Sequence, residues 1–122
     1  MKNQIHRQFV VLEHNTASER HWDLMLESGQ MLWTWRMTIH PAEIKDSSIP
    51  AEHIFDHPLK FLTYEGPVQN ETGNVKIAEK GSLEFISTGE KMLLIKLGGN
   101  LLHGFYTLRQ NNESLWNFQK KV

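Results

Sequence analysis

The chain has 122 residues, a length that predicts one domain, residues 1–122, built around a single hydrophobic core. Its 13 Lys and Arg nearly balance its 14 Asp and Glu, so the sequence lacks the basic excess of a protein that grips duplex DNA through many phosphates. The absence of cysteine excludes disulfides and thiolate metal sites, and it leaves His, Asp and Glu as the strong metal ligands.

Three possible metal ligands lie on the first two predicted strands. An apolar run at residues 8–12 predicts a strand, and His14 follows two positions later. The segment 21–27 alternates strictly, and successive side chains of a strand point to opposite faces, so His21 and Asp23 share one face. Two imidazoles and a carboxylate suit a borderline divalent ion and leave coordination positions open for water or substrate. Ordinary half-exposed strands also carry such residues, so a strand without a metal is the alternative interpretation.

The next strand is predicted at residues 31–39. Its alternating apolar residues form a stripe that we interpret as core, because aromatic side chains commonly fill the interior of sheets. The stripe consists of Met31, Trp33, Trp35, Met37 and Ile39. Residues 40–53 are polar and interrupted by two prolines, which predicts a loop, suited to act as a lid, with a helical turn at 42–45. We expect its histidines, His40 and His53, to be solvated.

The rest of the chain predicts a β fold with little helix. Pro58 disfavours helical geometry at His57, which places His57 at the edge of a strand or turn. From residue 75 onward, short apolar segments alternate with turns that contain glycine, and they predict strands at 75–78, 82–87, 91–97, 101–110 and 114–119. Evenly spaced short strands are typical of antiparallel barrels and sandwiches. We therefore predict a mainly β protein, a single antiparallel β-barrel or sandwich.

The order and spacing of these motifs resemble the 3'-phosphoesterase domain that occurs at the N-terminus of bacterial DNA ligase D and as a free-standing protein. The resemblance covers residues 8–120 and rests on the following residues: Phe9-Val10-Val11, His14, His21-Trp22-Asp23-Leu24-Met25-Leu26-Glu27, Trp35, Asp56-His57-Pro58-Leu59, Tyr64-Glu65-Gly66, Gly73, Gly81, Leu102, Gly104, Tyr106, Leu108 and Trp116. The family has an Arg where this chain has Met25 and a Tyr where this chain has Phe61. Arg20 and Arg36 are candidates to supply the missing charge to a substrate.

The resemblance implies a site as well as a fold. In the family, the equivalents of His14, His21 and Asp23 hold a manganese ion, and the equivalent of His57 belongs to a cluster that grips the 3'-phosphate. It therefore implies a metal triad at these three residues, with Mn as the cofactor and Zn or Co as alternatives. It also implies a catalytic or phosphate-contacting role for His57. Glu27 lies on the same strand face as the triad, and we expect it to be too far along the strand to ligate the ion.

The leading hypothesis is a metal-dependent phosphoesterase that removes a 3'-terminal phosphate or ribonucleotide from a nucleic-acid end, or that acts on a small phosphate ester. We expect a monomer that works beside a separate DNA ligase or polymerase. No apolar segment has the length of a membrane span or forms a signal peptide, so we also expect a cytoplasmic location and no membrane contact. One alternative is a catalytically degenerate barrel that binds a metal, a nucleic-acid end or a partner protein. Another is an oxygen-using non-haem iron enzyme, because His-x-Asp with a distant His is also a facial-triad pattern.

Overall fold

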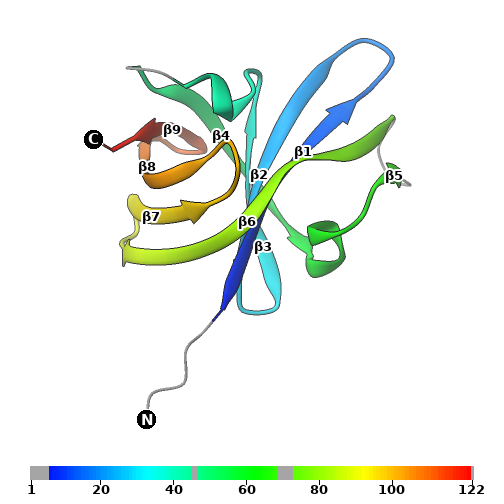
Figure 1. Cartoon of the computed structure of the whole chain (residues 1–122). Helices are drawn as coiled ribbons and strands as arrows, with labels where there is room; N and C mark the ends of the chain where they lie inside the picture. The colour runs from blue at the N-terminus through cyan, green and yellow to red at the C-terminus, as the bar shows by residue number, and fades with distance from the viewer. Residues whose placement is uncertain (1–5, 45–46, 69–72, 122) are drawn as a thin grey trace.

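Strands dominate the structure, a computed structural model that describes residues 6–44, 47–68 and 73–121. The elements are, in order, β1 (Arg7–Asn15), β2 (Arg20–Ser28), β3 (Met31–Met37), the 3-10 turn η1 (Pro41–Glu43), β4 (Ile49–Pro58), the 3-10 turn η2 (Leu59–Leu62), β5 (Gly66–Pro67), β6 (Asn74–Thr88), β7 (Met92–Gly98), β8 (His103–Asn112) and β9 (Leu115–Lys120). Eight of these strands pair antiparallel in the order β1-β2-β3-β4-β9-β8-β7-β6, and a pairing between β1 and β6 closes the barrel (Figure 1). The predicted antiparallel barrel is therefore confirmed.

Strand β6 is continuous over 15 residues, whereas the sequence predicted two strands at 75–78 and 82–87. Gly81 lies between the two predicted strands, and it allows close packing instead of forming a turn. A Cβ atom at Gly81 would lie only 2.2 Å from the carbonyl oxygen of Gly98 on β7. The first part of β6 pairs with β1 and the last part pairs with β7, so one long strand connects the closing seam to the second half of the barrel.

The segment predicted as a loop, residues 40–53, is only partly a loop. Strand β4 begins at Ile49, and the helical turn lies at Pro41–Glu43 instead of 42–45. Proline suits the first position of a helical turn because its backbone angle is already helical and its missing N–H is not needed there. Residue 45 lies outside the described residues. Among the described residues, no helix is long and apolar enough to cross a membrane.

The two histidines of this segment are only partly exposed and have structural partners, so the expectation that they are simply solvated is wrong. The His40 ring is partly buried and caps η1, because its Nδ1 accepts a hydrogen bond from the Ala42 N–H at 3.0 Å. His53 lies on β4, where its ring stacks on Trp35 with centroids 4.5 Å apart. Burial lowers the pKa of His53, and the nearby Asp56 carboxylate opposes that shift only in part. Both rings thus have structural contacts.

The barrel interior holds the main hydrophobic core. It contains Phe9, Val11, Leu24, Leu26, Trp35, Met37, Ile49, Ala51, Leu83, Leu93, Ile95, Leu97, Tyr106, Leu108, Trp116 and Phe118. The predicted apolar stripe is core at its centre, because Trp35 and Met37 are each 1% exposed. Its ends are not core: Met31 is 38% exposed and Ile39 is 42% exposed. Both lie at the ends of β3 or beyond it, where the barrel wall no longer covers them.

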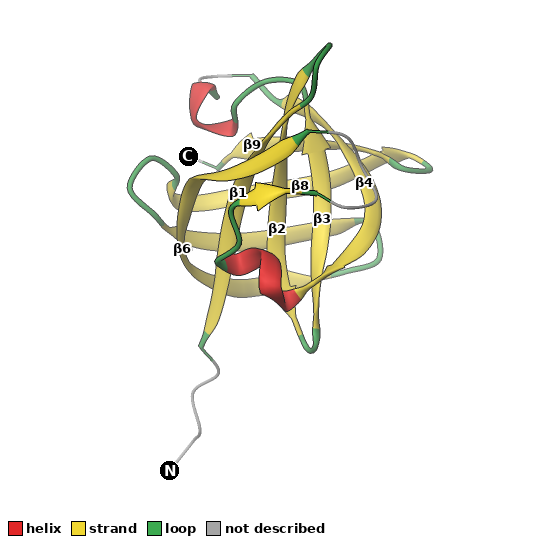
Figure 2. Ribbon diagram, turned by 90° about the vertical axis from the view of Figure 1, so that its right-hand side faces the viewer, coloured by secondary structure: helices red, strands yellow, loops and turns green. Residues whose placement is uncertain are grey.

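A second apolar cluster, which we call the outer cluster, lies on the outside of the barrel. Figure 2 shows η2 lying against this side of the barrel, and residues of η2 pack on the cluster. Its buried members are Val10, Leu12, Met25, Leu32 and Val75, with Leu59, Phe61, Leu62, Tyr64, Val68 and Ile77 packed against them. Val10 and Leu12 alternate along β1 with Phe9 and Val11, which point into the barrel. Strand β1 is therefore buried on both faces. Its inner face packs in the barrel core, and its outer face packs in the outer cluster.

Glu79 is a buried carboxylate that holds the connection between β7 and β8. It is 5% exposed and accepts hydrogen bonds from the backbone N–H groups of Leu102 at 2.8 Å, of Lys80 at 3.0 Å and of Leu101. Burial raises the pKa of Glu79, but these backbone donors together outweigh burial and leave the pKa below its ordinary value of 4.5. A Cβ atom at Gly99 would lie 2.6 Å from Glu79 Oε2, so only glycine lets the connection close over the carboxylate.

Replacing Glu79 should destabilise the fold in a pH-dependent way. Because its folded pKa is lowered, the stability that Glu79 contributes is present above 4.5 and is lost as the pH falls through the folded value. We expect Glu79→Gln to reduce the free energy of unfolding by about 1–3 kcal/mol near neutral pH and by less in acid. Urea unfolding at both pH values measures this, with the exposed Glu84→Gln on the same strand as the control. An equal loss at both pH values would contradict the assignment.

Candidate functional site

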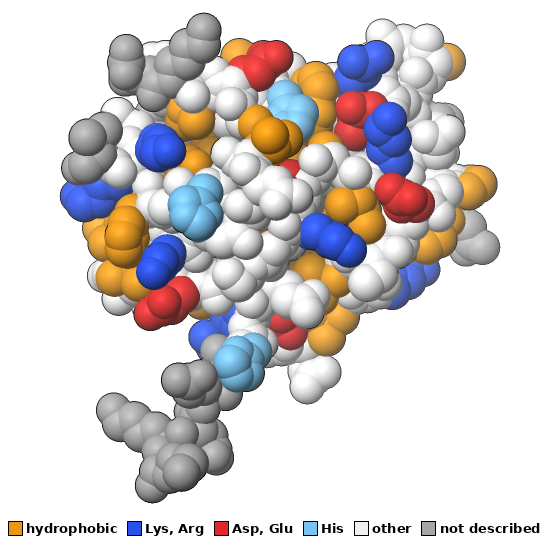
Figure 3. Space-filling model, in the orientation of Figure 1, with side chains coloured by type: hydrophobic (Ala, Val, Ile, Leu, Met, Phe, Trp, Pro, Cys, Tyr) orange, Lys and Arg blue, Asp and Glu red, His pale blue; other side chains and the backbone are white. Residues whose placement is uncertain are grey.

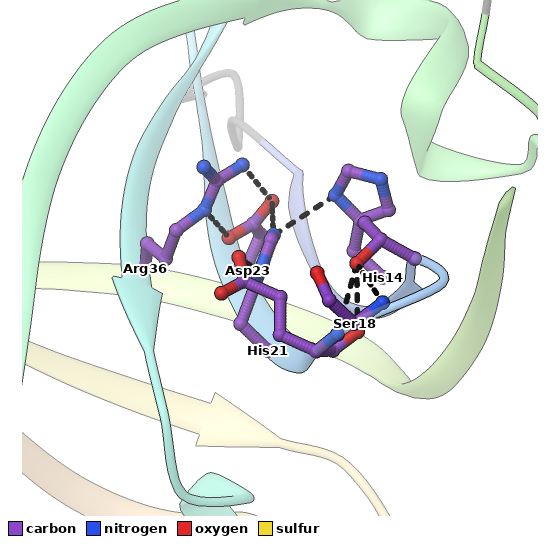
Figure 4. Close-up of polar contacts among 7 residues, drawn as sticks. His14, Ser18, His21, Asp23 and Arg36 are labelled. Atoms are coloured by element: carbon purple, nitrogen blue, oxygen red, sulfur yellow. Dashed lines mark hydrogen bonds and ion pairs between the residues drawn. The ribbon is translucent and has the colours of Figure 1, made fainter. Parts of the chain in front are cut away.

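The register between β1 and β2 brings the three predicted metal ligands together on the outer surface of the barrel. His14 lies opposite His21, and Asp23 is the next outward residue along β2. His14 Nδ1 is 2.9 Å from His21 Nε2, which is 4.0 Å from Asp23 Oδ2 (Figure 4). All three side chains are buried, and one donor atom from each lies within 4.8 Å of the others. Glu27 is turned away, because its Oε1 accepts the Gln8 N–H at 2.8 Å.

The donor set fits a divalent ion. Two imidazole nitrogens and a carboxylate are ligands that borderline divalent ions accept. His14 Nδ1 and His21 Nε2 lie 2.9 Å apart and share a hydrogen bond in the structure, and the donor atoms of all three residues lie within 4.8 Å of one another. Burial lowers the pKa of His21 below its ordinary value of 6.5, Arg36 and His14 lower it further, and Asp23 and Glu19 oppose the shift. His21 therefore remains neutral to lower pH than an exposed histidine, and the neutral ring is the form that ligates a metal.

Arg36 of β3 brings a guanidinium to this cluster from the neighbouring strand. It lies opposite Asp23 and donates from Nε to Oδ1 at 2.9 Å and from Nη2 to Oδ2 at 3.1 Å (Figure 4). This bidentate pair fixes the carboxylate, while each carboxylate oxygen keeps a second lone pair. Met25 is 2% exposed and belongs with Phe61 to the outer cluster. Both positions at which the resemblance called for a polar side chain therefore make apolar contacts here.

Arg20 lies beside the triad, in a cleft of about 520 Å³ that His21 and Arg36 also line. Its Nε donates to Asn15 Oδ1 at 3.0 Å. Glu19 and Glu52 line the same cleft, so its charge is mixed. The two arginines that the sequence offered as substrate contacts thus share one cleft at the edge of the triad.

His57 lies near the end of β4 and is 7% exposed. Its Nδ1 is 3.0 Å from the carbonyl oxygen of Phe55 and 3.0 Å from Thr34 Oγ1. The Thr34 hydroxyl in turn donates to the carbonyl oxygen of Leu32 at 3.1 Å. A carbonyl oxygen only accepts, so this network assigns the proton to His57 Nδ1. Nε2 is then the nitrogen of His57 that can exchange a proton with a ligand.

One cleft connects His57 to the metal-ligand cluster. It has a volume of about 610 Å³ and is lined by His14, Asp23 and His57. Apolar and basic side chains complete its walls: Leu12, Met25, Phe55, Pro58, Lys60, Phe61, Tyr64, Pro67, Val68 and Val75. The volume is in the range of small-molecule sites, about 300–1,000 Å³. The structure therefore places two of the three predicted ligands and the predicted phosphate contact in one cleft.

Sequence reasoning missed three residues of this site: Thr34, Phe55 and Lys60. Thr34 is fully buried and orients His57. It shares a strand face with Arg36, so the alternation of β3 was a signal that could have identified it. Phe55 and Lys60 line the cleft because β4 bulges and η2 follows it directly, and neither feature has a periodic signal in the sequence.

The family described as the DNA ligase D 3'-phosphoesterase domain matches residues 13–110, a range that includes the whole cluster and His57. The chain is 29% identical over 117 residues to the multifunctional non-homologous end joining DNA repair protein LigD of Mycobacterium tuberculosis. It is 27% identical over 124 residues to the multifunctional non-homologous end joining protein LigD of Mycolicibacterium smegmatis. Each match covers 88% of this chain but only 15% or 16% of the relative. With the family matched over most of its length, this chain belongs to the DNA ligase D 3'-phosphoesterase domain family.

Proposed function

We propose that this chain is a metal-dependent phosphoesterase that removes a 3'-terminal phosphate or ribonucleotide from a nucleic-acid end. One observation carries the proposal: His57, whose Nδ1 proton is held by Phe55 and Thr34, lines the same cleft as His14 and Asp23. Membership in the family supports the phosphoesterase reaction class. The relatives are named as end-joining proteins, which supports a nucleic-acid end as the substrate.

His14, His21 and Asp23 would hold the ion, with Mn as the leading choice and Zn or Co as alternatives. When bound there, a divalent ion supplies positive charge to the phosphoryl oxygens. Arg36 keeps the Asp23 carboxylate in place through two hydrogen bonds. Burial favours the neutral form of His21 by lowering its pKa, so the protein itself maintains this ligand in the form that binds a cation.

His57 is the proposed general acid. Its Nδ1–H is fixed by two acceptors, so protonation at Nε2 produces an imidazolium that can donate toward the cleft. At a 3'-phosphate, a water oxygen forms a bond to phosphorus, the bond from phosphorus to the 3'-oxygen breaks, and His57 Nε2 gives its proton to that leaving oxygen. The protons of the water remain with the released phosphate. At a terminal ribonucleotide, the bond from phosphorus to the 5'-oxygen of the ribonucleoside breaks first in the same way, which releases the nucleoside and leaves a 3'-phosphate. A histidine suits this step because its charge changes near neutral pH.

The arginines at the cleft edge are the proposed contacts to the substrate backbone. Arg20 and Arg36 line the neighbouring cleft of about 520 Å³, next to His21. Hydrolysis leaves a 3'-hydroxyl, the group that a ligase or polymerase extends or joins, so we propose that a separate enzyme of this kind uses the product. We also propose that the protein acts as a monomer.

The second candidate is a degenerate barrel that binds a metal or a nucleic-acid end without turnover. It is favoured by the apolar packing of buried Met25 and partly buried Phe61 in the outer cluster, because these side chains supply no hydrogen bond to a phosphate. Loss of one charged phosphate contact costs about 3–4 kcal/mol of transition-state stabilisation, or about a hundredfold or more in rate. The hydrolysis experiment below separates the two candidates.

Mn(II) should stabilise the folded protein, and the triad should be required for it. A ligand that binds only the folded state raises the melting temperature, so we expect a shift in the wild type that His21→Ala and Asp23→Ala each remove. The exposed His103→Ala is the control. The shift should weaken once the pH falls through the lowered pKa of His21, because protons then compete with the ion for that imidazole. A shift retained in both triad variants would place the ion elsewhere.

Hydrolysis of a primer-template that ends in a 3'-phosphate or a single 3'-ribonucleotide tests the proposed activity directly. With Mn(II), we expect the wild type to release phosphate or nucleoside and His21→Ala and Asp23→Ala to release none. His57→Ala should lower kcat by about a hundredfold or more while it keeps the Mn(II)-induced thermal shift. No release from the wild type, with the thermal shift intact, would refute the phosphoesterase and leave the binding module.

Thr34 should act by positioning His57. Thr34→Val removes one acceptor of the His57 Nδ1–H, a change of about 1 kcal/mol, so kcat/KM should fall roughly fivefold. Thr34→Ser keeps the hydroxyl and should keep the activity. The Mn(II)-induced thermal shift should be unchanged in both variants, since neither touches the triad. Equal activity of the Val and Ser variants would show that the hydroxyl is not used.

A further inference from the structure

Phe55 is an unusually exposed aromatic residue at the mouth of the main cleft. It is 66% exposed, more than any other large hydrophobic residue in the described part of the chain. Single exposed apolar residues are common and need no explanation. Phe55 differs because it lines the cleft that holds His14, Asp23 and His57, so its exposed ring borders the proposed reaction site.

A bulge in β4 gives Phe55 this position. Strand β4 has one residue more than β3 between the pairs Ile54–Thr34 and His57–Leu32. Bulges change the direction of side chains and occur often beside active sites. Here the bulge leaves Phe55 at the surface while His57 still points to the outer face, where its partner Thr34 lies. The ring is therefore held by a strand and not by a loose loop.

One face of the Phe55 ring is already used. It stacks on the His57 imidazole with centroids 4.7 Å apart and planes 16° from parallel. Phe61 meets the same imidazole edge-on, with centroids 5.7 Å apart. The His57 imidazole thus has Phe55 on one face and Phe61 at one edge. The other face of Phe55 is open to solvent. A second flat ring placed on that face would continue the stack.

We infer that the open face of Phe55 binds the base of the terminal nucleotide at an unpaired 3' end. The inference rests on the proposed function, because it gives the base that accompanies the phosphate at His57 a place in the same cleft. Bases stack on aromatic side chains without regard to sequence, since every base has a π-face. Lys60 lines the cleft as well, with its ammonium 5.3 Å from the Phe61 ring and 5.8 Å from the Tyr64 ring, and adds positive charge for the sugar-phosphate chain.

The net charge of the molecule favours contact with one terminal nucleotide over contact along the length of a duplex. The chain has a net charge of -1, and on the face shown in Figure 3 the basic and acidic side chains of the described residues are interspersed. A net charge near zero favours affinity from a few local contacts at an end over many phosphate contacts along a duplex. A stacking platform also requires a base that is free of its partner strand. The expected preference is therefore for frayed or single-stranded 3' ends over paired ones.

Binding of an oligonucleotide that carries 2-aminopurine as its 3'-terminal base tests the stacking directly. The fluorescence of 2-aminopurine decreases when the base stacks, so we expect quenching by the wild type and by Phe55→Trp, and none by Phe55→Ala. Phe105→Ala is the matched control, because Phe105 is an exposed Phe of β8 outside the cleft. For the wild type, we also expect a KM about tenfold lower for an end that carries a base than for an abasic end. We expect Phe55→Ala to have the same KM for both ends.

The outcomes separate this inference from the proposed function. Quenching that depends on Phe55 without hydrolysis would refute the phosphoesterase and support the platform. Hydrolysis with equal quenching by wild type and Phe55→Ala would support the enzyme and overturn the platform. A concentration-dependent dimer in sedimentation that Phe55→Ala abolishes would assign the ring to a second copy of the chain and would also overturn it.

Discussion

The antiparallel register of β1 and β2 is the constraint on which the site depends. Strand side chains alternate with a period of two, so the pairing of His14 with His21 puts Asp23 on the same outer surface. A slip by one residue would turn His21 and Asp23 into the barrel interior, where polar groups without partners are costly. The same slip would turn Leu24 out of the core. The same register of β1 and β2 therefore places the apolar residues in the core on one face and the ligand cluster on the other face.

The outer cluster gives this surface site some of the properties of an interior. Segment η2 covers the outward side chains of β1, so the donor cluster lies beside a dry, packed patch. In such surroundings electrostatic interactions are less screened than on an open strand. Met25 and Phe61 strengthen the apolar packing, and the nearest guanidinium of the cluster comes instead from Arg36 on the next strand. Arg36 thus supplies the positive charge next to Asp23 in this chain.

The sequence predicted those parts of the molecule that depend on local periodicity. Strict alternation identified the strand of His21 and Asp23, and glycine turns identified the β class. It could not predict the continuity of β6, because Gly81 has the same signature whether it turns the chain or lets two strands approach. The pairing of Arg36 with Asp23 and of Thr34 with His57 depends on which strands are neighbours. These pairings depend on tertiary packing, so they cannot be predicted from the pattern of any single segment.

From the topology we expect local strand pairings to form before the barrel closes. The ligand cluster, Arg36, Thr34 and His57 all belong to β1–β4, consecutive strands that pair with their neighbours in sequence. His14 and His21 are only 7 residues apart, and hairpins of that kind form in about 1–10 μs. Closure of the barrel joins Arg7 to Leu83, a non-local pairing that forms more slowly because loop entropy must be overcome first. Local contacts thus assemble the chemical groups on the outer surface, and the strands that follow close the barrel behind them.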